Sequence, residues 1–206
     1  MILNDFDAVI FDFGGVLIDI DYELTIQAFE KLGVSDFQQR YSQANQIGLF
    51  DDLETGKISP QAFINKMLEF FPSGVSANKI VFAWNSMLKD VPMETIDILI
   101  RLKQSKIKVY LLSNTNAIHI DAALRKWEKA TSNSFYDMFD KVYLSHEIGL
   151  RKPTKEIFDF VIDDQQLIPS KTLFIDDSVQ HIEGAKLAGL ITHHLKKIDQ
   201  LKTLFS

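Results

Sequence analysis

Five short apolar runs are spaced along the chain, and within them apolar residues do not alternate with polar ones. They span residues 8–13, 108–113, 141–144, 172–175 and 190–194. Such runs are typical of strands that are buried on both faces of a parallel sheet. From the second run onward they alternate with helical stretches, of which 93–104 and 179–188 carry apolar side chains at three- and four-residue steps. The pattern predicts βαβ units with right-handed crossovers in a doubly wound α/β sheet.

The chain between the first two runs contains no convincing strand. Helical candidates lie at 22–32, 35–46, 60–70 and 77–88. Ser59 and Pro60 match an N-cap followed by proline at the first helical position, and Pro72 opens a turn through Gly74. We therefore expect residues 18–88 to form a helical insert after the first strand. Residues 1–17 and 89–206 would then form the α/β core.

The predicted insert is rich in aromatic residues. They are Tyr22, Phe29, Phe37, Tyr41, Phe50, Phe63, Phe70, Phe71, Phe82 and Trp84. A small helical bundle needs bulky side chains to build a core, so we expect most of them to be buried there. One or two of them would remain to face a ligand.

Composition narrows the class of protein. The 206 residues suffice for one α/β domain with an insert, and 46% hydrophobic with 24% charged residues is typical of ordered globular chains. Twenty-two basic against 28 acidic residues give a net charge of −6, without a basic block, which argues against nucleic acid as a partner. No cysteine is present, so disulfides, thiolate zinc sites and cysteine nucleophiles are excluded.

The sequence shows no secretory signal, and its longest apolar runs are the size of strands. We therefore expect a cytoplasmic protein that does not span a membrane. A monomer or a weak homodimer acting on a small molecule is the expected state.

Polar side chains follow four of the predicted strands. Asp12 ends the first and precedes Gly14 and Gly15, Ser113 and Asn114 end the second, Lys152 follows the third, and Asp176 and Asp177 end the fourth. The carboxyl ends of parallel strands share one edge of a sheet, where ligands bind. We expect these residues to converge there.

Three carboxylates and a lysine, without a cysteine or histidine partner, suit an oxygen-rich Mg²⁺ site. A carboxylate of ordinary pKa is ionised at neutral pH, so Asp12 needs no activating base to act as a nucleophile. With a phosphate dianion the three carboxylates carry five negative charges, and Mg²⁺ with Lys152 supplies three positive ones. The remainder must be offset by the backbone at Gly14 and Gly15 and by the Ser113 and Asn114 side chains. The residues predict phosphoryl transfer with Mg²⁺ as the cofactor.

The four segments resemble the four motifs of the haloacid dehalogenase superfamily. They are Phe11-Asp12-Phe13-Gly14-Gly15-Val16-Leu17, Leu111-Leu112-Ser113-Asn114-Thr115-Asn116, Gly149-Leu150-Arg151-Lys152-Pro153 and Phe174-Ile175-Asp176-Asp177-Ser178. The resemblance extends over essentially the whole chain, because the helical insert resembles that superfamily's C1-type cap.

This resemblance implies a role for each residue. Asp12 is the expected covalent nucleophile and a metal ligand, and Lys152 neutralises both the nucleophile and the phosphate. Ser113 and Asn114 are expected to bind the phosphoryl group. Asp177 and the carbonyl of Gly14 are expected metal ligands, with Asp176 supporting the metal directly or through water.

Position 14 departs from the superfamily's usual pattern. Its phosphatases usually carry a second aspartate two residues after the nucleophile, as general acid and base, and this chain has Gly14 there. Such catalysis is typically worth about 10²–10⁴ in rate. One hypothesis is a phosphatase for an ester with a good leaving group, and the Asp-x-Gly start resembles the α-glucose-1-phosphate phosphatase branch. Asp19 and Asp21 are possible substitute acids, although capping of the first insert helix is the favoured interpretation.

Two other hypotheses accommodate Gly14. A 2-haloacid dehalogenase needs no acid and no Mg²⁺, but the pair Asp176 and Asp177 would repel an anionic haloacid. A catalytically silent protein that binds phosphorylated ligands is the third hypothesis, and the intact nucleophile and lysine argue against it. The phosphatase hypothesis is favoured.

Substrate clues come from the insert. Residues 18–88 hold 5 basic and 9 acidic residues, a charge of −4, which favours a substrate that is neutral beyond its phosphate, such as a sugar. Glu54, Gly56, Lys57 and Ser59 form a polar turn that either reaches this sugar or is a plain loop.

Four further residues have weaker expected roles. His119 lies one turn into the helix after Asn114, and His146 precedes the Lys152 loop, so each is a candidate supporting residue. His193 and His194 end the last strand and are expected to face solvent.

Overall fold

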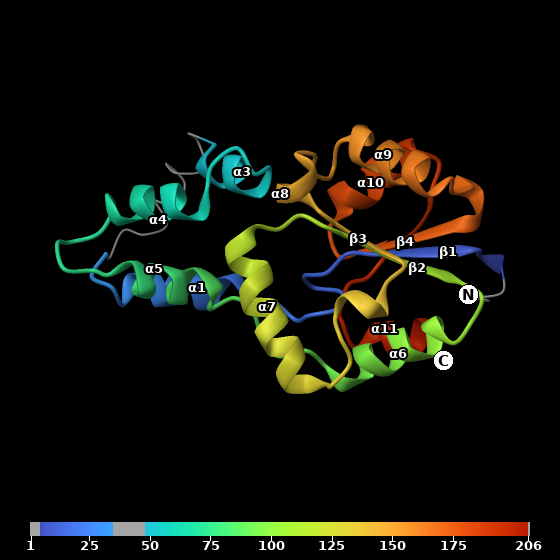
Figure 1. Ribbon diagram of the computed structural model, residues 1–206, viewed down its shortest axis with the longest axis horizontal. Helices are drawn as coiled ribbons and strands as arrows, with labels where there is room; N and C mark the ends of the chain where they lie inside the picture. Colours follow the sequence, from blue (N-terminus) through green and yellow to red (C-terminus); the bar gives the residue numbers. More distant parts are fainter. Residues whose placement is uncertain (1–4, 35–47, 206) are drawn as a thin grey trace.

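The computed structural model describes residues 5–34 and 48–205, and within them one parallel sheet carries the fold (Figure 1). Its strands are β1 (Ala8–Phe11), β2 (Lys108–Ser113), β3 (Lys141–Leu144), β4 (Thr172–Asp176) and β5 (Ile191–His194). They are ordered β3-β2-β1-β4-β5, so the chain winds outward from β1 in one direction and then in the other. The predicted doubly wound α/β sheet is confirmed, with every strand within two residues of its predicted bounds.

Helices connect the strands along the chain. Between β1 and β2 lie α1 (Tyr22–Glu30), α3 (Leu49–Glu54), α4 (Pro60–Leu68), α5 (Ala77–Asn85) and α6 (Met93–Lys103). After β2 follow α7 (Ala117–Ala130), α8 (Ser145–Ile148), α9 (Lys155–Gln165), α10 (Val179–Leu187) and α11 (Gln200–Leu204). The helix predicted at 35–46 lies outside the described residues, and α3 was not predicted. Within the described residues, no helix has both the length and the apolar character that a membrane crossing requires.

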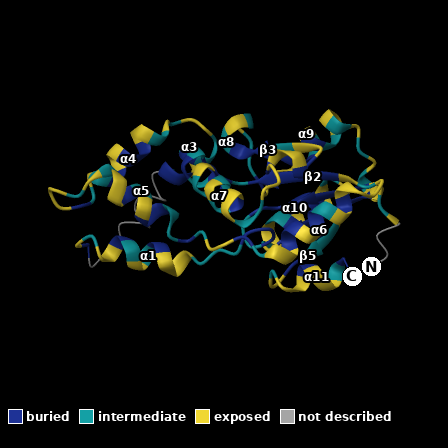
Figure 2. Ribbon diagram, turned by 60° about the horizontal axis from the view of Figure 1, so that its bottom comes forward, coloured by how far each residue is buried: buried dark blue, intermediate teal, exposed yellow. Residues whose placement is uncertain are grey.

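Both faces of the sheet are covered by helices. Val9 and Phe11 of β1 belong to a hydrophobic cluster with α6, α7 and α11, whereas Ala8 and Ile10 pack against α9 and α10 on the opposite face. All four side chains are buried, and the neighbouring strand β2 is drawn mostly in the colour of buried residues in Figure 2. Because each face meets helices, the strands contain apolar residues at consecutive positions, which explains why no alternation was visible in the sequence.

The helices α1, α3, α4 and α5 form a helical body at one end of the molecule, away from both termini (Figure 1). It has a hydrophobic cluster of its own, built around Phe29, Phe50, Phe63 and Trp84. Ile118, in the first turn of α7, also belongs to that cluster and joins the helical body to the sheet region.

The aromatic residues of the insert divide between interior and surface. Phe29, Phe50, Phe63, Phe71 and Trp84 are buried, as predicted. Tyr22 is 61% exposed and Phe82 is 75% exposed, so these two lie at the surface. Phe37 and Tyr41 lie outside the described residues.

The two linkers between the helical body and the sheet region pair with each other. Ile20 and Leu88 form an antiparallel bridge. The Lys89 amide donates to the Asp19 carbonyl at 2.9 Å, and the Lys89 Nζ lies 2.6 Å from the Asp19 carboxylate. Asp21 caps α1, since its side chain accepts a hydrogen bond from the Glu23 amide at 3.1 Å. Both carboxylates that were considered as substitute acids are therefore engaged in structural contacts.

Candidate active site

The strand register places Asp12 beside Asp176. Phe11 pairs with Ile175, and the Asp12 amide donates to the Ile175 carbonyl at 2.9 Å, so the next residue of each strand meets at the carboxyl edge. Lys152 completes the group, with its Nζ 2.8 Å from Asp12 Oδ1 and 2.7 Å from Asp176 Oδ2. The structure thus brings together three of the residues predicted from separate strand ends.

Lys152 is held from several sides. Its side chain is fully buried, and its Nζ lies 5.5 Å from the centre of the Phe174 ring. Its backbone N–H donates to Asn114 Oδ1 at 2.9 Å, and Asn114 Nδ2 donates to its carbonyl at 2.8 Å. The Asn114 side chain, expected to contact a phosphoryl group, therefore fixes the loop that carries the lysine. Ser113 is buried at the end of β2.

The two carboxylates that share Lys152 respond differently to burial. For Asp12, burial raises the pKa to about 7 although Lys152 opposes the shift, and the negative charge of Asp176 adds to it. For Asp176, burial also raises the pKa, but Lys152 and His181 outweigh burial and bring it down to about 2. The site therefore lacks positive charge at Asp12. Because carboxylate oxygens are the ligands that Mg²⁺ prefers, the donor set fits that cation.

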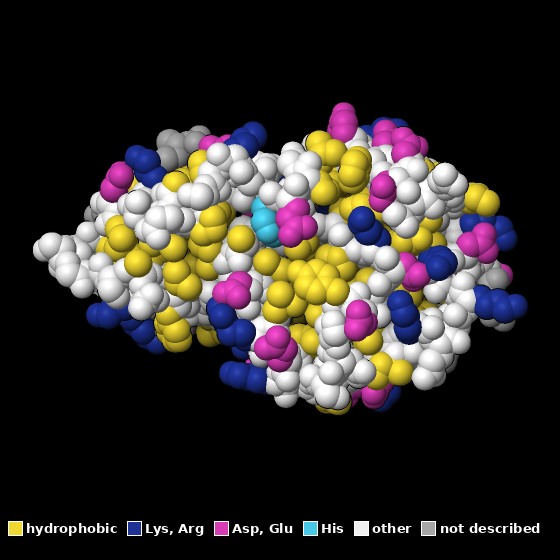
Figure 3. Space-filling model, viewed as in Figure 1, with side chains coloured by type: hydrophobic (Ala, Val, Ile, Leu, Met, Phe, Trp, Pro, Cys, Tyr) yellow, Lys and Arg dark blue, Asp and Glu magenta, His cyan; other side chains and the backbone are white. Residues whose placement is uncertain are grey.

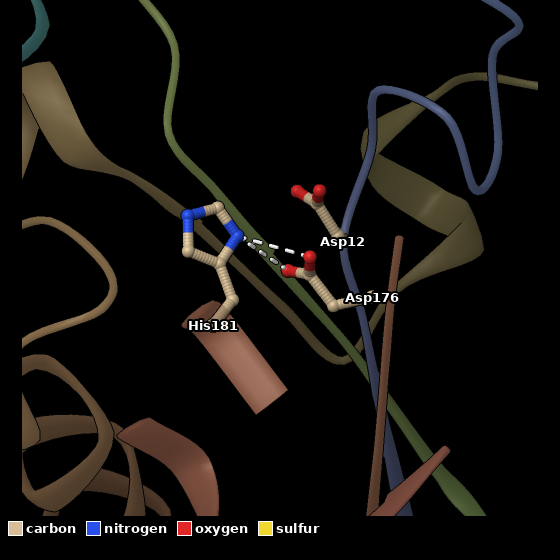
Figure 4. Close-up of side chains that lie close together, drawn as sticks. All are labelled: Asp12, Asp176 and His181. Carbon is tan, nitrogen blue, oxygen red and sulfur yellow. Dashed lines mark hydrogen bonds and ion pairs between the residues drawn. The ribbon is translucent and has the colours of Figure 1, made fainter. Parts of the chain in front are cut away.

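His181 belongs to this site although the sequence interpretation passed it over. Its Nδ1 lies 2.9 and 3.0 Å from the two Asp176 oxygens (Figure 4). The Ser178 amide donates to Asp176 Oδ1 at 2.8 Å, so both Asp176 oxygens already have partners. Within the described residues, Asp12, Asp176 and His181 form a group whose ligand atoms all lie within 4.8 Å of one another. A histidine in the first turn of the helix after the aspartate pair was the signal available in the sequence.

Asp177 lies against the backbone of Gly15. Gly15 has a φ of +74°, and a Cβ at this position would lie 2.3 Å from Asp177 Oδ2. Burial raises the pKa of Asp177, and the neighbouring Asp176 raises it further. His194 Nε2 lies 3.0 Å from the Asp177 carbonyl, so this strand-end histidine contacts the site's backbone. Asp177 is not a member of the group formed by Asp12, Asp176 and His181.

Gly14 provides no side chain for acid or base chemistry. A Cβ there would lie 3.3 Å from Ile20 Cδ1, the far end of a flexible side chain, so a larger residue meets only a mild obstacle. A lack of space at the Cβ position therefore does not explain why position 14 carries no acid.

The helical body touches the sheet region beside Lys152. Arg151 forms ion pairs with Asp51 and with Glu54 of α3, the latter at 3.0 Å. Burial raises the pKa of Glu54 against the opposing effect of Arg151. Gly56, with φ at +69°, leaves no space for a Cβ, which would lie 2.1 Å from the His146 carbonyl. The polar turn considered in the sequence therefore packs against α8 and next to Arg151.

His119 forms a second contact between the helical body and the sheet region. Its ring stacks on Trp84 of α5 with centres 4.9 Å apart, and its Nδ1 lies 2.8 Å from Asn85 Oδ1. Burial lowers its pKa to about 3, so the ring is neutral at physiological pH.

These features define a class of α/β hydrolases with a parallel sheet, an aspartate after the first strand, a lysine and an acidic pair at its carboxyl edge, and a helical insert after that strand. The chain belongs to the haloacid dehalogenase-like hydrolase family, whose model matches residues 6–189.

Several proteins are similar to this chain over most of its length. A D-ribitol-5-phosphate phosphatase of Bacteroides thetaiotaomicron is 38% identical over 184 residues, 89% of each protein. A sesquiterpene phosphatase of Aspergillus oryzae is 25% identical over 195 residues, 92% of this chain and 90% of that protein.

Solved structures of a HAD family enzyme are also similar to this chain over most of its length. The HAD family enzyme bt-2542 of Bacteroides thetaiotaomicron has a TM-score of 0.91 at 35% identity, over 98% of both chains. An aspartate-to-alanine variant of that enzyme, in complex with magnesium and inorganic phosphate, has a TM-score of 0.88 at 34% identity, over 98% of this chain and 100% of that one.

Proposed function

We propose that this protein is a Mg²⁺-dependent phosphomonoester hydrolase that acts on a sugar or sugar-alcohol phosphate through an aspartyl phosphate on Asp12. The observation that carries the proposal is the charge at the sheet edge. Lys152 contacts two buried carboxylates. Its single positive charge does not offset burial at Asp12, whose pKa is raised to about 7. Two similar proteins are a sugar-alcohol phosphate phosphatase and a HAD enzyme with bound magnesium and phosphate.

Residue roles follow from the contacts. Bound Mg²⁺ supplies positive charge for Asp12 and the phosphate oxygens, and Asp12, Asp177 and the Gly14 carbonyl would hold it. Asp176, whose oxygens already have partners, supports the metal site by fixing Lys152 and His181. Ser113 and the Gly15 backbone are the proposed phosphoryl contacts. Asn114 positions Lys152, and any contact it makes with the phosphate is additional.

The reaction has two displacement steps. An Asp12 oxygen attacks phosphorus, the bond between phosphorus and the ester oxygen breaks, and the leaving alcohol takes a proton from water, because position 14 offers none. Water then attacks the phosphorus of the aspartyl phosphate and gives up a proton to solvent, which balances the proton that the alcohol took. The bond between phosphorus and the Asp12 oxygen breaks, inorganic phosphate is released, and the Asp12 carboxylate is regenerated. Lys152 is charged before the reaction begins, since Asp12 and Asp176 outweigh burial and raise its pKa.

We further propose that residues 18–88 act as a cap over this site. The paired linkers, at 16–19 and 89–92, are the proposed hinges. Crystal forms with and without ligand that show no rotation of the helical body relative to the sheet would contradict this proposal.

Two other functions fit the residues less well. A haloacid is itself an anion, and Asp12, Asp176 and Asp177 would oppose its binding unless a cation is present. A silent phosphate-binding protein has no need for a buried lysine held between two carboxylates. A surface suited to nucleic acid is not favoured either, since basic and acidic side chains are interspersed on the face shown in Figure 3.

The test is a screen of phosphate release from sugar and sugar-alcohol phosphates, with Mg²⁺ and with EDTA, beside chloride release from chloroacetate. Phosphate release that EDTA abolishes is expected. Chloride release insensitive to EDTA would establish a dehalogenase, and the absence of either reaction would favour the silent binder.

A further inference from the structure

The helical body and the sheet region meet at two contacts of different chemistry. At the first, Trp84 of α5 stacks on His119 of α7 at 4.9 Å, and Ile118 of α7 joins the hydrophobic cluster of the body. This contact is largely apolar, and α5 leads directly into the second linker. At the second, α3 lies beside α8 and forms ion pairs with Arg151 (Figure 1). Only the second contact depends on charge.

Arg151 reaches two carboxylates of α3. Its Nη2 lies 3.0 Å from Glu54 Oε2, and its Nη1 pairs with Asp51. The Glu54 side chain is 25% exposed and that of Asp51 is 60% exposed. Because water and salt screen exposed charges more than buried ones, Glu54 is the partner whose charge depends most on Arg151.

The pairing with Arg151 has no equivalent elsewhere at this boundary. Among the ion pairs of the described residues, only those of Arg151 join α1, α3, α4 or α5 to the sheet region. The backbone is close here too, since a Cβ at Gly56 would lie 2.1 Å from the His146 carbonyl of α8. The body is therefore in direct contact with the sheet edge at the place where Arg151 holds α3.

These ion pairs lie next to the proposed reacting groups. Arg151 directly precedes Lys152, whose Nζ lies 2.8 Å from Asp12 Oδ1. Asp12 is 7% exposed and Lys152 is 0% exposed. A substrate reaches such buried groups only after part of the structure moves. Release of α3 from Arg151 is a movement that begins directly beside them.

The balance of charge shows what the contact depends on. Burial raises the pKa of Glu54 and the charge of Asp51 adds to the rise, whereas Arg151 and, less strongly, Lys152 oppose it. The ionised Glu54 is thus less stable at this boundary than in water, even with Arg151 present. Removing one partner of a buried ion pair is costly because the other charge is left without compensation. Without Arg151, Glu54 would regain water if α3 moved away from the sheet edge.

We propose that Arg151, Asp51 and Glu54 form a latch that keeps the helical body closed on the sheet edge, and that separation of Arg151 from Glu54 opens the site. The inference rests on the proposed function of residues 18–88 as a cap, and it names the contact that holds this cap closed. Arg151 acts through α3 and not on the reacting atoms.

The test measures the position of the helical body in the substrate-free protein. The chain contains no cysteine, so Lys66→Cys on α4 and Lys186→Cys on α10 place spin labels at these two positions only. Both lysines are more than half exposed and pair only with a residue three positions away. Double electron–electron resonance then gives the distribution of distances between the labels. At low salt one closed distance is expected, and at about 1 M NaCl, where the Debye length is about 3 Å, longer distances should appear.

Two variants of the labelled protein separate charge from packing. Arg151→Met should raise the population at longer distances about tenfold, because Glu54 is left buried without its counter-charge. Adding Glu54→Gln to that variant should return most of the population to the closed distance and abolish the response to salt. Arg125→Met is the matched control, since Arg125 pairs with Asp121 within α7 and should leave the distribution unchanged.

The outcomes distinguish the latch from the proposed function. A distribution in Arg151→Met equal to that of the labelled parent overturns the inference. Equal opening in Arg151→Met with and without Glu54→Gln also overturns it, since the effect would then come from lost packing. Phosphate release with an unchanged distribution overturns the inference alone. The expected distances in a protein that releases no phosphate from any ester overturn the proposed function and leave the latch supported.

Discussion

The sheet edge and the helical body contribute to the site in opposite ways. At the sheet edge, Asp176 has partners on both oxygens and Lys152 is held by two carboxylates and by Asn114. Where the helical body meets that edge, Glu54 pairs with Arg151, but the buried Trp84 Nε1 has no hydrogen-bond partner in the described chain. Groups that perform chemistry are fixed before substrate arrives, because a misplaced reacting group costs rate. The boundary with the helical body leaves part of its hydrogen-bonding capacity unused.

Asp12→Asn tests the sheet-edge half of this comparison most strongly. Turnover should fall at least about 10³-fold, the scale seen when a nucleophile is removed. Folding should be retained: the folded-state pKa of Asp12 is raised to about 7, so its ionised form opposes folding above that pH. Phosphate release and a thermal melt without metal are the measurements. Near-normal turnover, with Asp159→Asn on α9 as the reference, would refute a covalent role.

Gly15→Ala should have the next largest effect. The new methyl would lie 2.3 Å from Asp177 Oδ2, so it must displace this carboxylate and the backbone near Asp12. A displacement of about 1 Å can cost about 10² in kcat/KM. Gly149→Ala is the matched control, since Gly149 has a φ of +72° and no atom within 4 Å of its Cβ position. Steady-state kinetics at saturating Mg²⁺ should separate the two variants. Equal losses would assign the effect to backbone conformation alone.

Mg²⁺ affinity should depend on pH through Asp12. Its pKa is raised to about 7 without metal, so below that pH the carboxyl must lose a proton before it can bind the cation. Affinity should therefore rise about tenfold per pH unit up to about pH 7 and level off above it. Calorimetric titration with Mg²⁺ between pH 5.5 and 8 measures this, and Asp12→Asn should flatten the profile. A flat profile in wild type would remove Asp12 from the metal site.

Gly56→Ala tests the contact between the helical body and α8 and should have the smallest effect on chemistry. Its Cβ would lie 2.1 Å from the His146 carbonyl, so α3 must shift away from the sheet edge. KM should rise several-fold with a smaller change in kcat, and stability should fall by about 1–3 kcal/mol. Gly48→Ala shares the left-handed conformation, with φ at +72° and open space around its Cβ position. If both variants behave alike, the contact with α8 has no part in substrate binding.

The sequence predicted the sheet and its edge well because all the polar residues of the edge except Lys152 stand at the end of an apolar run. Asp12 and Asp176 lie side by side because β1 and β4 pair in parallel with Phe11 opposite Ile175, so the residues that follow are neighbours. Contacts between a side chain and a distant segment were not predicted. Asn114 bonds the backbone of Lys152, 38 residues away, and Arg151 pairs with Asp51, 100 residues away. No local pattern encodes such contacts.

The other features that were not predicted are a short helix and the directions in which helical side chains point. α3 has six residues, too few for a periodic pattern to be recognised. His181 was overlooked because its function depends on the angle at which α10 leaves β4, which directs the ring toward Asp176. Which aromatic side chains of the insert would be exposed was not predicted, because composition does not distinguish the two sides of a helix; Phe82 and Tyr22 are exposed.

The pairing of Asp19 with Lys89 and of Ile20 with Leu88 brings the two ends of the insertion together. The segment between these residues therefore starts and ends at one place beside the sheet, as the loop of a hairpin does. The entropy of closing such a loop grows only logarithmically with its length, so segments of very different size can be accommodated at this point for a similar cost. We therefore expect that the helical body can be replaced by an insertion of different length while the sheet and the residues at its edge keep their positions.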